Sequence, residues 1–309
     1  MTKISDIFKK QTGKRERISV LALKRAAMPH RPISFKRAYR NLARKIEEYE
    51  NNRSTILFSD SFSDSTIDDF VYFLKEKGYR SSTIRSFCQK IVTILHAAQR
   101  EGYIVNIQAR MSLPADEGSK AVYLTLEDLQ KLNDLNLKLE NAAIRDIFLI
   151  GCFTTLRYSD YSKLTRENII ENDIVIKTKK TGAAVRIPMH PYIHAIFEKY
   201  HYFLPVMKSQ QNFNMRIKNI CKKAGINELI RIERTVGLKI ERKNYPKWKL
   251  VSSHTARRSG ATNMYLAGIP VFRIMLITGH KTQESFFRYI RITAEENATT
   301  LANHPFFKK

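Results

Sequence analysis

Two residues near the end of the sequence, His254 and Arg257, suggest chemistry on a phosphate group. They are three positions apart, so on a helix both side chains lie on one face and reach the same small anion. The planar guanidinium of arginine matches two phosphate oxygens better than the point charge of lysine does. The adjacent Arg258 points about 100° away around a helix and is not expected to share that face. The pair therefore predicts an anion site.

A candidate nucleophile for this site follows in the sequence. Tyr289 stands between Arg288 and Arg291. A tyrosine forms a covalent ester with phosphate where cationic neighbours stabilise its phenolate. Tyr158 and Tyr265 are the rival tyrosines. The sequence thus favours a phosphoryl-transfer site with a protein nucleophile.

A buried helical stripe is expected to connect these groups. Its apolar residues are Met264, Leu266, Ile269, Val271, Ile274, Met275 and Ile277. The stripe is broken where the sequence reads A-G-I-P at 267–270, because proline cannot continue a helix. Such a scaffold is expected to hold His280, directly after Gly279, close to His254.

The ordered combination of these motifs resembles a known signature. The run H-T-A-R-R-S at 254–259, the G-H at 279–280 and the tyrosine nine residues later resemble the C-terminal signature of tyrosine recombinases, the phage integrase family. The amino-acid sequence of these motifs is most similar to that of integrases from Bacteroides-type mobile elements. Each motif alone is common, since H-x-x-R is usually a solvated helix face and G-H usually a helix end. Their joint spacing carries the resemblance.

The resemblance implies a site-specific DNA recombinase or integrase. Tyr289 attacks a backbone phosphate, which leaves a 3′-phosphotyrosyl intermediate and a free 5′-hydroxyl, and strands are exchanged through a Holliday junction. The covalent ester keeps the bond energy, so no ATP, metal or other cofactor is expected. Two alternative functions are compatible with the same motifs. One is a type IB topoisomerase or telomere resolvase, and the other is a catalytically inert basic DNA-binding protein.

Arg157 is a second predicted phosphate ligand. It follows the strongly apolar segment 144–153, where burying a guanidinium is costly unless it meets an anion. The segment resembles the first arginine motif of the family. It departs from that motif where Thr155 replaces the usual glycine and Asp160 the usual glutamate, changes that concern the turn more than the arginine.

The family's catalytic lysine lies on a β-hairpin, and residues 172–188 have a hairpin pattern. Counting back from the I-P at 187–188 aligns Lys180 with it, with Lys179 and Lys177 as rivals. The family pattern implies that Lys180 protonates the leaving 5′ oxygen. It also implies that His254 assists proton transfer at the nucleophile and that His280 hydrogen-bonds the phosphate.

The net charge points to a polyanionic partner. In 309 residues, Lys and Arg number 54 and Asp and Glu 29, a formal charge of +25, which favours nucleic acid first. The hydrophobic fraction of 43% is sufficient for real cores. The residues predicted to contact DNA are Lys14, Arg37, Arg40, Arg44, Arg80, Arg85, Lys90, Lys239, Arg242 and Lys243.

The cysteines and the start of the chain suggest a cytoplasmic protein. Cys88, Cys152 and Cys221 are far apart and lie in apolar runs, as expected of reduced core thiols. The charged N-terminus has no signal-peptide pattern, and no apolar run has the length of a membrane span. We expect a bacterial, nucleoid-associated protein with no membrane contact.

The expected architecture is mainly α with small β-hairpins, an α+β fold that clamps DNA. Residues 1–30 are predicted as a basic arm, 31–111 as a helical core-type DNA-binding domain and 112–121 as a linker. Residues 122–309 are predicted as a mixed α/β catalytic domain with a C-terminal tail at 290–309. Helix caps are expected within the groups 64–66 and 81–83 and at Thr125, and a second hairpin is expected at 230–251.

The partners expected from the resemblance are DNA and further copies of the chain. The DNA is double-stranded and carries specific recombination sites. The protein is expected to be a monomer or dimer when free and a homotetramer on two duplexes, linked by tails that dock on neighbouring protomers, with a DNA-bending accessory protein as a further partner. The apolar residues of the tail, Ala294, Ala298 and Leu301 followed by Phe306 and Phe307, need a host surface because so short a segment has no core.

Overall fold

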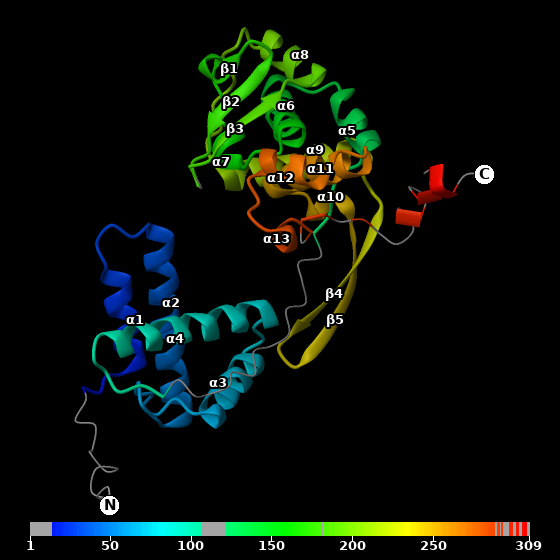
Figure 1. The fold of residues 1–309 in the computed structure, drawn as a ribbon. Coiled ribbons are helices and arrows are strands. Elements are labelled where there is room, and N and C mark those ends of the chain that lie inside the picture. The colour runs from blue at the N-terminus through cyan, green and yellow to red at the C-terminus, as the bar shows by residue number, and fades with distance from the viewer. Residues whose placement is uncertain are drawn as a thin grey trace, which may run out of the picture. The chain divides into compact units, whose positions relative to one another are not determined.

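The computed structural model describes residues 14–106, 121–180, 182–287, 289–290, 292, 297–298, 301–302 and 305–307. The chain forms two compact units, each with its own hydrophobic core. The first comprises residues 1–117 and 233–242, and the second comprises residues 118–232 and 243–309. Both are largely helical, with short antiparallel strands, so the predicted fold class is confirmed (Figure 1).

The first unit is built from α1 (Ile18–Ala27), α2 (Ile33–Arg53), α3 (Asp64–Glu76) and α4 (Ser81–Arg100). Apolar residues recur every three or four positions in these helices, which gives each one a buried face. At the centre, Tyr49 packs edge-on against Phe70 and Phe73 at ring-centroid distances of 5.3 and 5.5 Å. These four helices are the blue-to-cyan ones in Figure 1.

Residues 18–27, which the sequence placed in a basic arm, instead form α1 and help to build the core. Ile18, Leu21, Ala22 and Ala26 are buried, a three-and-four spacing that the surrounding cations concealed. Residues 1–13 of the arm and 107–120 around the predicted linker lie outside the described residues. The remaining domain boundaries stay predictions.

Two predicted helix caps need correction. The cap of α3 is Ser63, whose Oγ accepts the N–H of Thr66 at 3.3 Å, while Asp64 is the first helical residue. Helix α4 begins at Ser81 without a side-chain cap, because Arg80 occupies the N-cap position. Thr125 caps the next helix as predicted, within a capping box completed by Asp128.

The second unit is organised around α6 (Leu139–Thr154), in which every residue from Ala142 to Cys152 is buried. Its neighbours are α5 (Leu126–Asn133), the short α7 (Tyr158–Tyr161), α8 (Pro191–Lys199), α9 (Gln210–Lys223), α10 (Lys247–Leu250) and α11 (Ser253–Leu266). Helix α6 packs on α5, α7, α8, α9 and α11. A fully buried helix of this kind is a rigid support for groups placed at its end.

A small sheet lies beside the helices. After the 3₁₀ turn η2 (Arg166–Asn168), strands β1 (Ile169–Ile170), β2 (Asp173–Lys177) and β3 (Ala184–Pro188) pair antiparallel in that order. The predicted hairpin is β2–β3, in the register Ile174↔Ile187. Strand β1 was not anticipated, because two residues are too few for a recognisable alternation.

The second predicted hairpin is also present, as β4 (Leu229–Val236) and β5 (Lys239–Pro246). It is the long yellow ribbon in Figure 1. Its tip, residues 233–242, groups with the first unit. There the N–H of Gly237 donates to the carbonyl of Tyr79 at 3.0 Å.

The predicted stripe after α11 is buried only in part. Of its residues, Ile274 is buried in helix α12 (Val271–Thr278) and Ile269 is exposed. The other five, Met264, Leu266, Val271, Met275 and Ile277, are partly buried. The short α13 (Gln283–Phe287) and η3 (Pro305–Phe307) follow. No helix among the described residues is long and apolar enough to cross a membrane.

Candidate active site

A close approach of α6 and α11 organises the site. A Cβ added at Gly260 of α11 would lie 2.1 Å from the carbonyl oxygen of Cys152 and 2.6 Å from Cγ2 of Thr155. Only glycine therefore lets the two helices come this close. The approach places the first turns of α11, with His254 and Arg257, beside the end of α6.

Arg257 is the centre of this arrangement and is 2% exposed. Its Nη1 donates to the carbonyl of Thr155 at 2.8 Å, and its Nη2 donates to the carbonyl of Thr278. These carbonyls stand at the C-terminal ends of α6 and α12, where the helix dipole is negative. Its Nε is buried and has no hydrogen-bond partner among the described residues. Such a held guanidinium, with an unused donor, is suited to an anion.

The electrostatics of Arg257 fit an empty anion site. Burial, followed by the positive charge of Arg157, lowers the pKa of Arg257 to about 10. Two cations this close repel each other until an anion joins them. Tyr289 acts in the opposite direction and raises the pKa of Arg257.

Arg157 reaches the site through a backbone turn at Thr155. Thr155 ends α6 in a left-handed conformation, with φ 57°, which is uncommon for a residue with a β-branched side chain. The usual glycine is therefore replaced without loss of the turn. Arg157 then caps α7 and is partly exposed, and its charge lowers the pKa values of both His254 and His280.

Asp160 ties the β2–β3 turn to this cluster. One of its carboxylate oxygens, Oδ1, accepts the backbone N–H of Lys179 at 3.1 Å. Its Oδ2 is buried without a hydrogen-bond partner among the described residues. Lys180 is exposed on the same turn, and its charge lowers the pKa of His254, whereas neither Lys179 nor Lys177 is among the charges that do so. The assignment of Lys180 rather than its rivals therefore stays a prediction, supported by the action of its charge on His254.

His254 faces several cations. Burial lowers its pKa, although the side chain keeps an exposed edge. The charges that lower the pKa further are those of Arg258, Arg257, Lys180 and Arg157. His254 is therefore neutral at pH 7, since its pKa lies below the ordinary value. A neutral imidazole can accept a proton.

His280 is placed by the end of α12. Gly279 ends that helix with φ 66°, a left-handed conformation that favours glycine. The ring of His280 then packs between other aromatic rings, with Nδ1 2.8 Å from Oγ1 of Thr278. Burial, followed by the charges of Arg257 and Arg157, lowers the pKa of His280 to about 4.

Tyr289 lies against the same groups. Its ring centroid is 4.9 Å from that of His280. The guanidinium carbons of Arg257 and Arg258 lie 5.6 and 5.4 Å from it. The prediction that Arg258 points away from this site was wrong, because the residues at both i+3 and i+4 flank the helix face of His254. Arg288 and Arg291 lie outside the described residues.

The rival tyrosines lie in other surroundings. Tyr158 packs on Phe213 at 5.0 Å, and burial raises its pKa. Tyr265 is partly buried beside Phe287. The cluster thus contains the predicted set Arg157, Lys180, His254, Arg257, His280 and Tyr289, and adds three residues that sequence reasoning missed: Thr155, Arg258 and Thr278. For Thr278 the available signal was its place directly before the G-H motif.

Three of the residues predicted to contact DNA lie together on one helix, and the others lie on separate elements. Arg37, Arg40 and Arg44 line one hollow on α2, of about 610 Å³, since their spacing places them on one helix face. The others, Lys14, Arg80, Arg85, Lys239, Arg242 and Lys243, are distributed over several elements. Lys90 is partly buried on α4, where its ammonium donates to Ser86 of the preceding turn and burial lowers its pKa, and its DNA contact stays a prediction.

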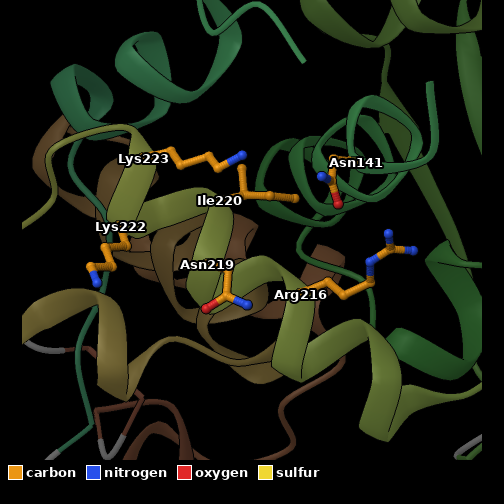
Figure 2. Close-up of a pocket in the computed structure, with 6 residues that line it drawn as sticks. All are labelled: Asn141, Arg216, Asn219, Ile220, Lys222 and Lys223. Atoms are coloured by element: carbon orange, nitrogen blue, oxygen red, sulfur yellow. The ribbon is translucent and has the colours of Figure 1, made fainter. Parts of the chain in front are cut away.

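A second hollow, of about 590 Å³, lies beside α9 and is lined by Asn141, Arg216, Asn219, Ile220, Lys222 and Lys223. Figure 2 shows that its cationic side chains point in different directions rather than at one another. Arg216 is also paired with Glu140. This hollow is therefore a basic surface and lacks the convergence of a small-anion site.

The described residues hold no group of three or more metal-ligating side chains.

Comparisons with known proteins agree with this geometry. A model of the phage integrase family matches residues 123–296, and a model of the phage integrase SAM-like domain matches residues 23–110. The first match spans the cluster from Thr155 to Tyr289. No curated protein sequence matched the chain.

Solved structures share the fold. The Tn1549 transposon integrase in complex with circular intermediate DNA is 16% identical, with a TM-score of 0.63 over 92% of this chain and 99% of that chain. XerH recombinase bound to difH is 15% identical, with a TM-score of 0.62 over 87% and 79%. A lambda integrase dimer bound to a core site is 13% identical, with a TM-score of 0.66 over 90% and 78%.

Proposed function

This chain belongs to the phage integrase family and is a site-specific DNA recombinase, and we propose that Tyr289 is the nucleophile with which it cuts and rejoins DNA. One observation carries this assignment of roles. The buried guanidinium of Arg257 is held by two helix-end carbonyls and keeps Nε for an anion, and the ring of Tyr289 lies 5.6 Å from it.

In the proposed first step, the Tyr289 oxygen attacks a backbone phosphorus. The bond from phosphorus to the 5′ oxygen breaks, which leaves a 3′-phosphotyrosyl ester. Negative charge grows on the two non-bridging oxygens, where Arg257 and Arg157 supply donors. By analogy with oxyanion donors, each contributes about 3–4 kcal/mol to the transition state.

The leaving oxygen needs a proton, and Lys180 is the proposed donor. Its place on a turn tethered through Asp160 supports this role. The resemblance to tyrosine recombinases gives His254 the proton transfer at the nucleophile and His280 a hydrogen bond to the phosphate. Rejoining reverses the step, with a 5′-hydroxyl from another strand as the attacking group, so Holliday junctions form and resolve without an external energy source.

A suicide substrate tests the proposal. A nicked duplex from an end of the protein's own mobile element releases a short 5′-hydroxyl fragment upon cleavage, so the covalent complex accumulates and survives denaturant. We expect the adduct at Tyr289, with Tyr289→Phe binding DNA normally and forming none. An adduct that persists in Tyr289→Phe would contradict the assignment, and supercoil relaxation without a specific site would identify a topoisomerase.

The assembly follows as a further part of the proposal. The chain binds double-stranded DNA at specific sites and acts as a tetramer on two duplexes, with a DNA-bending protein as an accessory partner. Leu301, Phe306 and Phe307 support this, because they are 41%, 81% and 58% exposed and are suited to burial against a neighbouring protomer. The nucleoid of a bacterial cell is the proposed place of action.

A further inference from the structure

Arg258 contacts the proposed nucleophile, although the resemblance to tyrosine recombinases gives this arginine no role. Its guanidinium carbon lies 5.4 Å from the centroid of the Tyr289 ring, and its Nη1 donates to the backbone carbonyl of Val122 at 3.3 Å. After burial, the charge of Arg258 is the strongest of the causes that lower the pKa of His254. This guanidinium therefore acts inside the cluster and not only at its surface.

The carbonyl that accepts this hydrogen bond belongs to a buried segment on α11. Residues 122–124, which we call the strap, are at most 7% exposed. The N–H of Leu124 donates to Oγ of Ser259 at 2.8 Å, and the carbonyl of Leu124 accepts Nδ2 of Asn263 at 3.0 Å. Ser259 and Asn263 are four positions apart, so they lie on one face of the helix. These two bonds fix the strap on α11 and make the carbonyl of Val122 a fixed acceptor.

Such an anchor matters for the ring of Tyr289. The backbone of Tyr289 is held, since its N–H donates to the carbonyl of the buried Phe286 at 2.7 Å. The side chain still rotates about its torsion angles, and its ring contacts Arg257, Arg258 and His280. Arg257 donates to two helix ends and serves the phosphate in the proposed step. Arg258 is held instead by the strap, and a guanidinium against an aromatic ring favours one orientation of that ring.

We propose that Arg258 is a positioning residue for the nucleophile: its guanidinium, anchored to the strap at the carbonyl of Val122, holds the ring of Tyr289 in the orientation from which the phenolic oxygen attacks. Its role differs from that of Arg257, because it acts on the tyrosine and not on the phosphate. The part of this inference that concerns cleavage rests on the proposed function, whereas the contact between Arg258 and the ring does not.

The first test observes the ring of Tyr289 in the free, full-length protein. Labelling with 3-fluorotyrosine makes all 14 tyrosines visible by ¹⁹F NMR, and Tyr289→Phe identifies the signal of Tyr289. We expect Arg258→Met, which keeps the stem but lacks the charge, to shift this signal, and Arg258→Lys to shift it less. Arg273→Met is the matched control, because Arg273 lies over the ring of Phe272 on the exposed side of α12. An unchanged Tyr289 signal in Arg258→Met would overturn the proposal, whatever the enzyme's activity.

The second test separates an action on the tyrosine from one on the phosphate. We expect Arg258→Met to cleave the suicide substrate about tenfold more slowly, as the loss of a cation–aromatic contact would, with unchanged DNA affinity, and Arg258→Lys to recover most of the rate. A methylphosphonate at the cleavage position lacks the charge that a phosphate clamp neutralises. It should therefore reduce the defect of Arg257→Ala and leave that of Arg258→Met as it is. Equal relief of both defects, or weaker DNA binding by Arg258→Met, would show that Arg258 acts on phosphate and refute the proposal. An absence of adduct in the wild type would instead contradict the proposed function and leave the first test in force.

The third test concerns the anchor and keeps every side chain in place. Replacement of Tyr123 by the corresponding α-hydroxy acid converts the carbonyl of Val122 from an amide into an ester, which is a weaker acceptor. We expect this change to slow cleavage about two- to tenfold, as the loss of one hydrogen bond would. In the Arg258→Met background it should have no further effect, because both changes remove the same contact. An unchanged rate in the wild type, or equal slowing in both backgrounds, would show that the strap does not anchor Arg258.

Discussion

A buried guanidinium is stable only where its donors meet acceptors. At Arg257 the acceptors are the helix-end carbonyls of Thr155 and Thr278, which are uncharged and carry only the partial charge of a helix end. A carboxylate in their place would neutralise the arginine and weaken its attraction for phosphate. The choice of partners keeps the full positive charge available to DNA.

Arg257 is buried and held by two carbonyls, whereas the adjacent Arg258 is partly exposed. This difference leads to a prediction for the two arginines. We expect Arg257→Ala to reduce the cleavage rate by about 10²- to 10³-fold, the loss typical of an oxyanion donor. Arg258→Ala should cost about tenfold, the worth of a cation–aromatic contact of roughly 1.4 kcal/mol, because Arg258 is partly exposed and lies 5.4 Å from the Tyr289 ring. Single-turnover cleavage measures both, with melting curves as the check on folding.

Equal losses of cleavage rate from the two variants would show that Arg257 contributes no more to catalysis than Arg258 does. An intact cleavage rate in Arg257→Ala would remove the basis of the proposed phosphate clamp.

At the scale of elements, the site depends on how helix ends and turns converge. The ends of α6 and α12 and the start of α11 meet around Arg257. The β2–β3 turn is attached to α7 through Asp160. Displacement of α11 from α6 would move Arg257 away from the carbonyl of Thr155.

Gly260→Ala tests this dependence. The added methyl would lie 2.1 Å from a backbone oxygen, so the helices must separate, which costs about 1–3 kcal/mol. We expect a lower melting temperature, at roughly 2–4 °C per kcal/mol, and slower cleavage. Gly225→Ala is the matched control, because a Cβ there meets nothing within 4 Å and adds only backbone strain. Equal effects of the two substitutions would contradict the close-approach argument.

At the scale of the whole molecule, the charge of +25 dominates DNA binding. The arginines of α2 line one hollow, and cations outnumber acidic residues 54 to 29 over the whole chain. Counterion release from phosphates should therefore supply most of the non-specific affinity.

We expect non-specific affinity to fall by about 10³- to 10⁵-fold between roughly 50 and 200 mM salt, if about 6–10 phosphates are bound. Alanine at Arg37, Arg40 and Arg44 together should reduce the salt slope by about one unit for each phosphate that is no longer neutralised. Arg186→Ala is the control, because Arg186 is already paired with Glu171 and Asp173. Fluorescence anisotropy over a salt series measures the slope, and a nearly flat series would argue against an electrostatic clamp.

The tail gives the prediction for assembly. We expect a chain lacking residues 295–309 to fold and to bind single sites, but to fail to form a tetramer on two duplexes or to complete strand exchange. This outcome is expected because the exposed aromatic residues of the tail pack on a neighbouring protomer rather than on the core of their own unit. Native gels and recombination assays measure the outcome. Normal recombination would exclude the role, and a lowered melting temperature would show that the tail packs on its own unit.

The sequence by itself determined the fold class, and it predicted which residues form the cluster. Three-and-four spacing of apolar residues predicts helices because a helix buries one face, and the hairpins follow from alternation. The site residues were recognisable because His254, Arg257, His280 and Tyr289 keep a fixed order and spacing. Local patterns also gave the cap at Thr125, since capping needs only neighbouring residues.

Only the tertiary structure decided which atoms meet. The hydrogen bond of Arg257 with Thr155 joins residues 102 positions apart, and no local pattern encodes it. The glycine needed at position 260 follows from a facing helix. Cations around residues 18–27 concealed a helix whose burial depends on α2, and the approach of Arg258 to Tyr289 depends on the turn after α12.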